Sequence, residues 1–376
     1  MTNTATVVDN GTVWVSLKEV REMLSLYGER ITLKLVGEPG IGKSSLLPAK
    51  AEDNGDKWRK PGDYYADDKY NYLYIDCPNE EIGDRKMKIP VHSTKSLEDY
   101  ISSEFRLSEG KPLYIMLDEF DKCPKALQVL FARMILERTI GSNPLPPGSV
   151  IFITTNNASD GLGDATKGHN INRVMVVHVR KSNNKEMAAY ALSKNADPAL
   201  VAWMAATKQA FNCSYLDGNQ QNNPYIFKPN ITTPFVSGRS AMACDFIIKQ
   251  RHTTSPRITM AALTGTIGAA GARSLMACVD LNDKVPKTEE IIKAPTAIAI
   301  PDDALAQILM MIHGASDVET QDEVEAFMQF VERIPSSEVQ SIFFHMMVTS
   351  ANPAKVILVR NNSRLTKWRK DNYELI

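Results

Sequence analysis

The sequence has few cysteines, no long apolar run and almost no net charge, so it lacks the usual features of a disulfide-bonded, membrane-spanning or polyanion-binding protein. Its five cysteines are an odd number without a C-x-x-C pair, so free thiols in a reducing compartment are expected. These cysteines are Cys77, Cys123, Cys213, Cys244 and Cys278. Lysine and arginine total 43 against 44 acidic residues, and a net charge of −1 gives no overall attraction to nucleic acid or anionic lipid. A local basic groove remains compatible with this balance.

Long apolar segments are also scarce. No run approaches the roughly 20 apolar residues of a membrane-spanning helix. The N-terminus, residues 1–5, has no basic segment followed by an apolar core. The glycine-rich motif at 265–271 stands beside charged residues and is interpreted as a place of close helix packing. We therefore expect a cytoplasmic protein without a membrane partner.

The first half of the chain alternates apolar runs with amphipathic segments. Residues 13–28 have helical periodicity, and 31–36 are typical of a buried strand that enters a glycine-rich loop. A helix opens at Ser44, and residues 52–72 are polar and tyrosine-rich, as in an exposed insertion. Further strands are expected at 72–75, 113–117, 150–154 and 174–179, and a further helix at 125–138. Strands alternating with helices predict a parallel sheet covered on both faces.

The composition changes after Lys181. Residues 184–210 are alanine-rich and helical, 212–236 are irregular, and almost everything from Gly238 onward has a helical pattern. We therefore expect three regions. The first is an α/β core at 1–182, which contains the insertion at 52–72. The second is a helical lid region at 183–260, which includes an irregular segment, and the third is a C-terminal helical region at 261–376.

The glycine-rich loop matches the pattern G-x-x-x-x-G-K-[ST] and lies between a predicted strand and a predicted helix. Its glycines allow backbone N–H groups to turn toward phosphates, and the helix N-terminus adds a favourable dipole. Lys43 would contact the β- and γ-phosphates, and Ser44 would ligate Mg²⁺. The sequence therefore predicts a site for Mg-ATP made by Gly37, Glu38, Pro39, Gly40, Ile41, Gly42, Lys43, Ser44 and Ser45.

Two adjacent carboxylates end the strand predicted at 113–117. Asp118 would hold the Mg²⁺ shell together with Ser44, and Glu119 would polarise the attacking water. A solvated acidic turn is the alternative. An adjacent Asp-Glu pair favours hydrolysis over transfer to a small acceptor, because a water must be activated in place. Asp121 suits a helix N-terminus better than a ligand position.

Two polar positions further along complete the candidate site. Asn156, at the tip of the strand predicted at 150–154, would orient the lytic water, with Asn157 as the alternative. Asparagine is also common in turns, so a structural role in a turn would explain either residue without a catalytic function. Arg173 cannot easily reach its own nucleotide, but it could act on a neighbouring subunit's γ-phosphate as an arginine finger in trans. A surface salt bridge is the other reading of Arg173.

These motifs, in this order, resemble those of AAA+ ATPases. Residues 118–124 with Leu127, Gln128 and Leu130, and residues 155–161 followed by 171–173, resemble MoxR-like AAA+ proteins of bacteria and phages. The segment Ser237-Gly238-Arg239-Ser240 is similar to their Ser-Pro-Arg second-sensor motif, with Gly in place of Pro. Ser255-Pro256-Arg257 is a rival match. Weaker similarity extends through 265–272, 286–301 and 333–338.

The resemblance implies a P-loop AAA+ core with a parallel β-sheet flanked by helices, followed by an α-helical lid and a C-terminal helical region. It implies a homo-oligomer, a hexameric ring or spiral, that hydrolyses Mg-ATP at subunit interfaces and remodels a protein client as a chaperone. A von Willebrand A-domain protein is a frequent partner. The implied catalytic residues are Glu119, Asn156, Arg173 and Arg239. Residues 81–89 could form a pore loop or an ordinary exposed connection.

Two other functions are compatible with the P-loop. A nucleic-acid motor or loader would use a basic tail with Trp368 for base stacking. The basic residues of that tail are Lys355, Arg360, Arg364, Lys367, Arg369 and Lys370. A solvated charged face is the simpler interpretation. A P-loop kinase is disfavoured because the Asp-Glu pair begins 74 positions after Ser44, and by the Asn and Arg positions.

Overall fold

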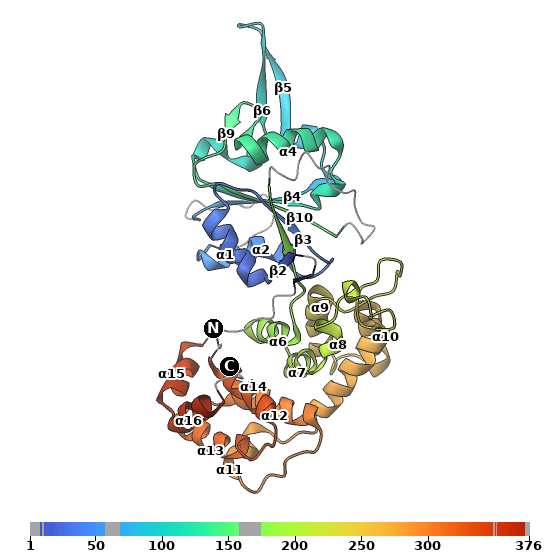
Figure 1. Ribbon diagram of the computed structural model, residues 1–376, viewed down its shortest axis with the longest axis vertical. Coiled ribbons are helices and arrows are strands. Elements are labelled where there is room, and N and C mark those ends of the chain that lie inside the picture. The colour runs from blue at the N-terminus through green and yellow to red at the C-terminus, as the bar shows by residue number, and fades with distance from the viewer. Residues whose placement is uncertain are drawn as a thin grey trace. The chain divides into compact units, whose positions relative to one another are not determined.

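The computed structural model describes residues 8–9, 11–56, 68–157, 174–348, 350 and 352–372. These residues divide after Lys181 into two compact units (Figure 1). The first is an α/β unit. In the second, the described elements are helices.

A sheet of seven strands, counted over the described residues, organises the first unit. In spatial order the strands are β1 (Val8–Asp9), β2 (Thr12–Val15), β11 (Met175–Val179), β3 (Leu33–Val36), β10 (Val150–Thr155), β7 (Leu113–Asp118) and β4 (Asn71–Asp76). β1 is antiparallel to β2, and all other neighbours are parallel. The carboxyl ends of the parallel strands therefore meet at one edge of the sheet, where α/β proteins bind ligands.

Helices cover both faces of this sheet (Figure 1). β7 and β10 each have a parallel neighbour on both sides, and every residue in them except Asp118 is buried. On one face, α1 (Leu17–Tyr27) and α2 (Leu46–Asp53) enclose a core with Leu35 and Met116. On the other face, α4 (Lys125–Glu137) packs Phe131 against Ile115. The parallel sheet with helices on both faces is as predicted.

The beginning of the chain differs from the prediction. Residues 13–15, expected in a helix, belong to strand β2, which pairs with His178 and Val179 of β11. Sheet pairing at this edge therefore overrides the helical periodicity. α1 begins only after Ser16, whose Oγ accepts from the backbone N–H of Glu19 at 3.2 Å while the Glu19 carboxylate accepts from the Ser16 N–H at 2.7 Å.

The insertion expected at 52–72 is shorter than predicted at both ends. Residues 52 and 53 complete α2, and residues 71 and 72 begin β4. Residues 57–67 lie outside the described part of the chain.

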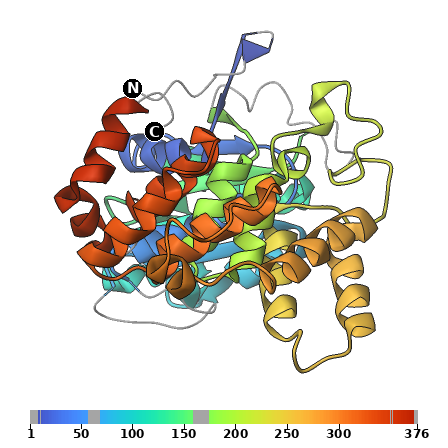
Figure 2. The ribbon, with the colours of Figure 1, turned by 90° about the horizontal axis from the view of Figure 1, so that it is seen from below.

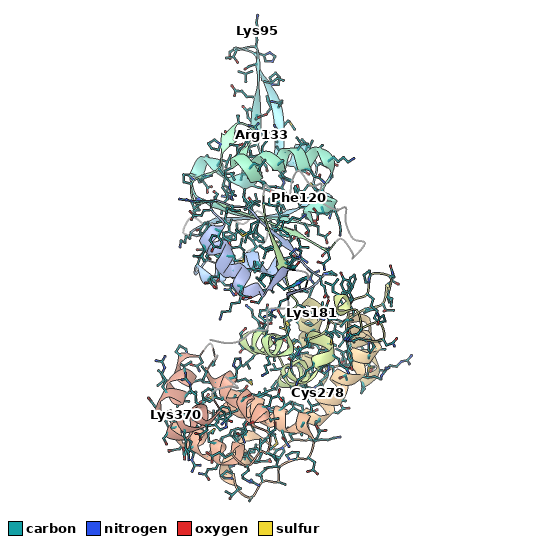
Figure 3. The ribbon with its side chains drawn as sticks, in the orientation of Figure 1. Lys95, Phe120, Arg133, Lys181, Cys278 and Lys370 are labelled. Atoms are coloured by element: carbon teal, nitrogen blue, oxygen red, sulfur yellow. The ribbon has the colours of Figure 1, made fainter. Side chains whose placement is uncertain are left out.

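Residues 81–89, expected as a loop, contain regular secondary structure, and their role as a pore element or an ordinary exposed connection stays a prediction. They form α3 (Ile82–Arg85) and the start of β5 (Lys86–Val91), which pairs with β6 (Ser96–Ile101) as an antiparallel hairpin. The hairpin projects from the unit, with Lys95 near its tip (Figures 1 and 3). A second, minor pair is β8 (Thr139–Ile140) and β9 (Asn143–Pro144). The prediction found neither pair. β5 and β6 have no buried residue and contain charged side chains, so they lack an apolar run, and β8 and β9 are only two residues long.

The second unit is built from packed helices. They are α6 (Asn184–Ser193), α7 (Pro198–Ala206), α8 (Lys208–Phe211), α9 (Gly238–Lys249), α10 (Pro256–Asn282), α11 (Thr288–Lys293), α12 (Ala304–Asp317), α13 (Gln321–Val331), α14 (Ser337–Val348), α15 (Pro353–Asn361) and α16 (Ser363–Asp371). These helices are coloured from green to red in Figures 1 and 2. A single buried apolar cluster extends from Met187 in α6 to Trp368 in α16. The division expected after residue 260 falls inside α10, so the structure does not separate the two regions there.

α10 carries the glycine motif at 265–271. Gly268 has φ 77° and interrupts the helix, and a Cβ there would lie 2.6 Å from the Pro234 carbonyl oxygen. The glycine therefore allows the irregular segment that contains Pro234 to approach α10 closely. The sequence analysis had expected the motif to serve the packing of two helices. Within the described ranges, α10 alone is long and apolar enough to cross a membrane, and its Leu263, Ile267 and Leu275 are buried in the unit's core.

Candidate active site

The P-loop lies at the carboxyl edge of the sheet, between β3 and α2. Gly40 and Gly42 have φ 75° and 105°, a left-handed backbone that glycine adopts without a steric penalty. A 3₁₀ turn at Lys43–Ser45 then leads into α2. Sequence and structure therefore agree on the strand, loop and helix that this motif requires.

Lys43 is held inside the loop. Its side chain is buried, and Nζ donates to the carbonyl oxygens of Gly37 at 2.6 Å and Glu38 at 2.8 Å. Nζ also lies 3.3 Å from Oδ1 of Asn156, which follows β10. These three oxygens are uncharged, and the oxygens of a bound phosphate would offer the ammonium group charged acceptors instead.

Asp118 is the centre of a group of hydroxyls. Its Oδ2 accepts from Ser44 Oγ at 3.1 Å and from the Tyr74 hydroxyl at 3.0 Å. Its Oδ1 accepts from Thr154 Oγ1. The structure therefore brings together Ser44 and Asp118, the two residues expected to hold Mg²⁺. It adds Tyr74 and Thr154, which the sequence analysis did not identify.

Tyr74 is the donor in its hydrogen bond with Asp118. Burial raises the pKa of its phenol well above the ordinary value, and the charge of Asp118 raises that pKa further. The phenol therefore stays protonated at neutral pH. No sequence motif marks this position, because the contact depends on β4 lying next to β7.

Glu119 has an uncommon backbone conformation. Its φ is 51°, a left-handed conformation that is rare for residues other than glycine and is concentrated at functional sites. Its backbone N–H donates to Thr154 Oγ1 at 3.3 Å, and its carboxylate accepts from Lys122 Nζ at 2.6 Å. This places Glu119 directly after Asp118, with its side chain held toward the following turn.

A buried ion pair anchors that turn. Lys34 of β3 reaches Asp121, with Nζ 3.0 Å and 3.2 Å from the two carboxylate oxygens. The two side chains are only 9% and 16% exposed. Asp121 was expected at a helix N-terminus, and it does lie in the 3₁₀ turn Phe120–Lys122. Its ion pair with Lys34 was not foreseen, because a lysine in an alternating strand suggests a solvent-facing position.

The remaining candidate residues fall in three places. Asn156 lies in the site beside Lys43, and Asn157 is buried next to it. Arg173 lies outside the described residues. Arg239 and Arg257 belong to the second unit, each exposed at the second position of a helix after a serine N-cap. This equivalent placement does not distinguish between them as second sensor.

The basic tail is less available than its sequence suggests. Trp368 is buried, and its Nε1 donates to Gln340, so it does not offer a stacking face. Lys355 donates to the carbonyl oxygens of Ala315 and Ser316 at the end of α12. Arg364 pairs with Glu325 and Glu332. The basic residues that remain exposed are Arg360, Lys367, Arg369 and Lys370.

The residues at the sheet edge fit a magnesium nucleotide. Among the described residues no three His, Cys, Asp or Glu side chains form a metal cluster by themselves. Mg²⁺ usually takes one or two protein oxygens together with substrate phosphates and water. Ser44 and Asp118 supply such oxygens next to a loop suited to phosphate.

The fold is an α/β core with a glycine-rich phosphate loop at the carboxyl edge of a largely parallel sheet, followed by a helical region. No protein-family model matches the chain, and no curated protein matches its sequence.

Similarities to solved structures are distant. RuvB from Thermotoga maritima, described as a Holliday junction branch migration motor, is 14% identical over 85% of this chain and 88% of that one, with a TM-score of 0.35. NtrX from Brucella abortus is 13% identical over 71% and 69%, with a TM-score of 0.32. Hsp104, in a closed state with FITC casein, is 11% identical over 66% and 39%, with a TM-score of 0.32. The assignment of function therefore depends on the residues of the site.

Proposed function

We propose that this chain is an AAA+ ATPase that hydrolyses Mg-ATP at subunit interfaces of a ring or spiral and uses the energy to remodel a protein client. The observation that carries the ATPase assignment is the contact of Ser44 Oγ with Asp118 Oδ2 at 3.1 Å, beside the buried Lys43. The P-loop and the carboxylate pair are far apart in sequence, and the fold brings them to one edge of the sheet. The MoxR-like assignment rests on the sequence resemblance alone.

The chain's own residues divide the chemistry among them. Lys43 and the loop N–H groups would bind the phosphates, and Ser44 and Asp118 would hold Mg²⁺, which neutralises phosphate charge when bound. Asn156 would orient the attacking water, and Glu119 would polarise it and accept its proton. Oε2 of Glu119 accepts from Lys122 Nζ at 2.6 Å, so Lys122 would compete with the water for this carboxylate.

The first test is ATP turnover by the full chain. Lys43→Ala should abolish nucleotide binding or turnover, whereas Lys50→Ala should leave both unchanged, since Lys50 lies in the last turn of α2, where its Nζ donates to Ser25 Oγ at 3.4 Å. Glu119→Gln should retain ATP without releasing phosphate. Normal phosphate release by Lys43→Ala would refute the ATPase assignment at this site, and a phosphorylated small acceptor in place of free phosphate would indicate a kinase.

The second test concerns the interface. If Arg173 acts in trans, a mixture of Arg173→Ala and Glu119→Gln subunits should regain activity that neither variant has alone. Roughly one quarter of the interfaces in a random equal mixture would combine an intact Glu119 with an intact Arg173. An inactive mixture of exchanging subunits would contradict action in trans. Electron microscopy of Glu119→Gln with and without ATP should show whether a hexamer, or another ring or spiral, forms.

The hairpin β5–β6 is our proposal for the client contact. On one of its faces Met87 and Tyr100 are cross-strand partners, 57% and 56% exposed. Arg85 at its base is buried and ion-paired with Glu80 and Glu104, which anchors the hairpin. Met87→Ser with Tyr100→Ser should lower client-stimulated ATPase activity and leave basal activity unchanged. A von Willebrand A-domain partner and a cytoplasmic location complete the proposal.

A nucleic-acid motor or loader is the alternative, supported by the four exposed basic residues of the tail. Stimulation of ATP hydrolysis by DNA or RNA, lost on neutralising Lys367 and Lys370, would favour the motor. No stimulation at low salt would count against it.

A further inference from the structure

Three hydroxyl groups from three separate elements converge on the Asp118 carboxylate. Tyr74 of β4 and Ser44 of the P-loop turn donate to Oδ2 at 3.0 Å and 3.1 Å. Thr154 of β10 donates to Oδ1 and accepts from the Glu119 N–H at 3.3 Å. Both oxygens of Asp118 therefore have a hydroxyl donor from a neighbouring strand.

The sheet fixes where these donors lie. Asp76, two residues after Tyr74, is the direct partner of Asp118 across the β4–β7 pair. Successive side chains of a strand alternate between faces, so Tyr74 and Asp76 point to the same face as Asp118. On the other side of β7, Ile153 is the partner of Leu117, which brings Thr154 beside Asp118. Thr154 is buried, and Tyr74 is half-buried against the core between the sheet and α2.

We propose that Tyr74 and Thr154 are positioning residues that clamp the two oxygens of Asp118 in the orientation that Mg²⁺ binding requires. This inference rests on the proposed ATPase function. A carboxylate that is free to rotate about its side-chain bonds must be ordered when the metal binds, which weakens binding. Hydrogen bonds from protein groups to a metal-binding carboxylate remove this cost, and their loss typically lowers metal affinity or activity 10–100-fold.

The chain provides a matched control for each member of the clamp. Tyr72 lies two residues before Tyr74 on the same face of β4, and its hydroxyl donates to Asp56 Oδ2 at 2.7 Å, away from the site. Thr155 follows Thr154 and is equally buried, but its Oγ1 donates to the Leu35 carbonyl oxygen at 3.5 Å. Tyr→Phe and Thr→Val at the paired positions remove the same hydroxyl from a similar environment.

The test uses Mn²⁺ as the metal probe and the non-hydrolysable nucleotide AMP-PNP with the full chain. Free Mn²⁺ is measured by electron paramagnetic resonance, and nucleotide affinity is measured separately in EDTA. Tyr74→Phe and Thr154→Val should each weaken Mn²⁺ binding at least about tenfold. Thr154→Ser should restore it. Tyr72→Phe and Thr155→Val should match the wild type, and metal-free nucleotide affinity should be the same in every variant.

The outcomes separate this inference from the function on which it rests. If the wild type binds neither AMP-PNP nor Mn²⁺ in its presence, the proposed function fails. If the wild type binds both and Tyr74→Phe and Thr154→Val bind Mn²⁺ equally well, the clamp is overturned while the function stands. Equal losses in the Tyr72 and Thr155 controls would also overturn the clamp, because the effect would then come from general destabilisation.

Discussion

The buried ion pair between Lys34 and Asp121 permits a quantitative prediction. Nζ lies 3.0 Å and 3.2 Å from the two carboxylate oxygens, and the side chains are 9% and 16% exposed. Removing one partner of such a pair costs about 3–5 kcal/mol, because the other buried side chain loses the opposite charge that it contacts. Replacing both partners by apolar side chains of similar size is often close to neutral. We therefore expect Lys34→Met and Asp121→Leu each to destabilise the first unit by about 3–5 kcal/mol, and the double variant to be more stable than either.

Urea denaturation of the full chain, with hydrogen exchange of peptides from β3 and β7, would measure these effects in the first unit. The ion pair of Arg133 with Glu137 on α4 is the matched control. Its atoms are 2.9 Å apart, but its side chains are 57% and 54% exposed. Breaking it should cost less than about 0.5 kcal/mol. The reasoning is refuted if the Lys34 and Asp121 variants cost as little as this surface pair, or if their effects simply add.

Two further predictions concern packing and thiol reactivity. A Cβ at Gly314 would lie 2.0 Å from a ring atom of Phe327, so Gly314→Ala should destabilise by about 1–3 kcal/mol. A Cβ added at Gly265 would have no atom within 4 Å, so Gly265→Ala should stabilise α10 by roughly 0.5–1 kcal/mol. Thermal melts measure both variants, and equal melting temperatures for the two would contradict the prediction. Cys213, which is partly exposed, should react first with a maleimide, while burial raises the pKa of Cys244 to about 12 and should slow its reaction. Equal labelling rates by mass spectrometry would count against the buried placement of Cys244.

The sequence predicts those parts of the site whose evidence lies in consecutive residues. The loop at 37–44 carries its own glycines, lysine and serine, and an apolar strand ending in Asp118 and Glu119 marks the edge of a sheet. Both predictions follow from local chemistry together with the rule that carboxyl ends of parallel strands share one edge. The fold class is predictable for the same reason, since alternating strands and helices leave few arrangements.

The errors have a common physical origin in tertiary neighbours. Residues 13–15 have a helical pattern but pair with β11, and Trp368 has an exposed sequence context but is buried against α14. The ion pair of Lys34 with Asp121, on which the sequence analysis made no prediction, likewise joins residues of two separate elements. In each case the deciding partner lies far away in sequence.

The Asp118 site shows how this limits a motif-based assignment. The P-loop pattern and the carboxylate pair identify which atoms could bind a magnesium nucleotide, but not whether those atoms are held in place. Tyr74 and Thr154 hold them, and neither belongs to a pattern that the sequence displays. A chain with phenylalanine at position 74 and valine at 154 would match the same motifs and bury the same strands, because both replacements are apolar and of similar size. Such a chain would lack the two hydroxyl donors to Asp118 that β4 and β10 supply. We therefore expect its affinity for the metal to be lower, although its motifs are the same.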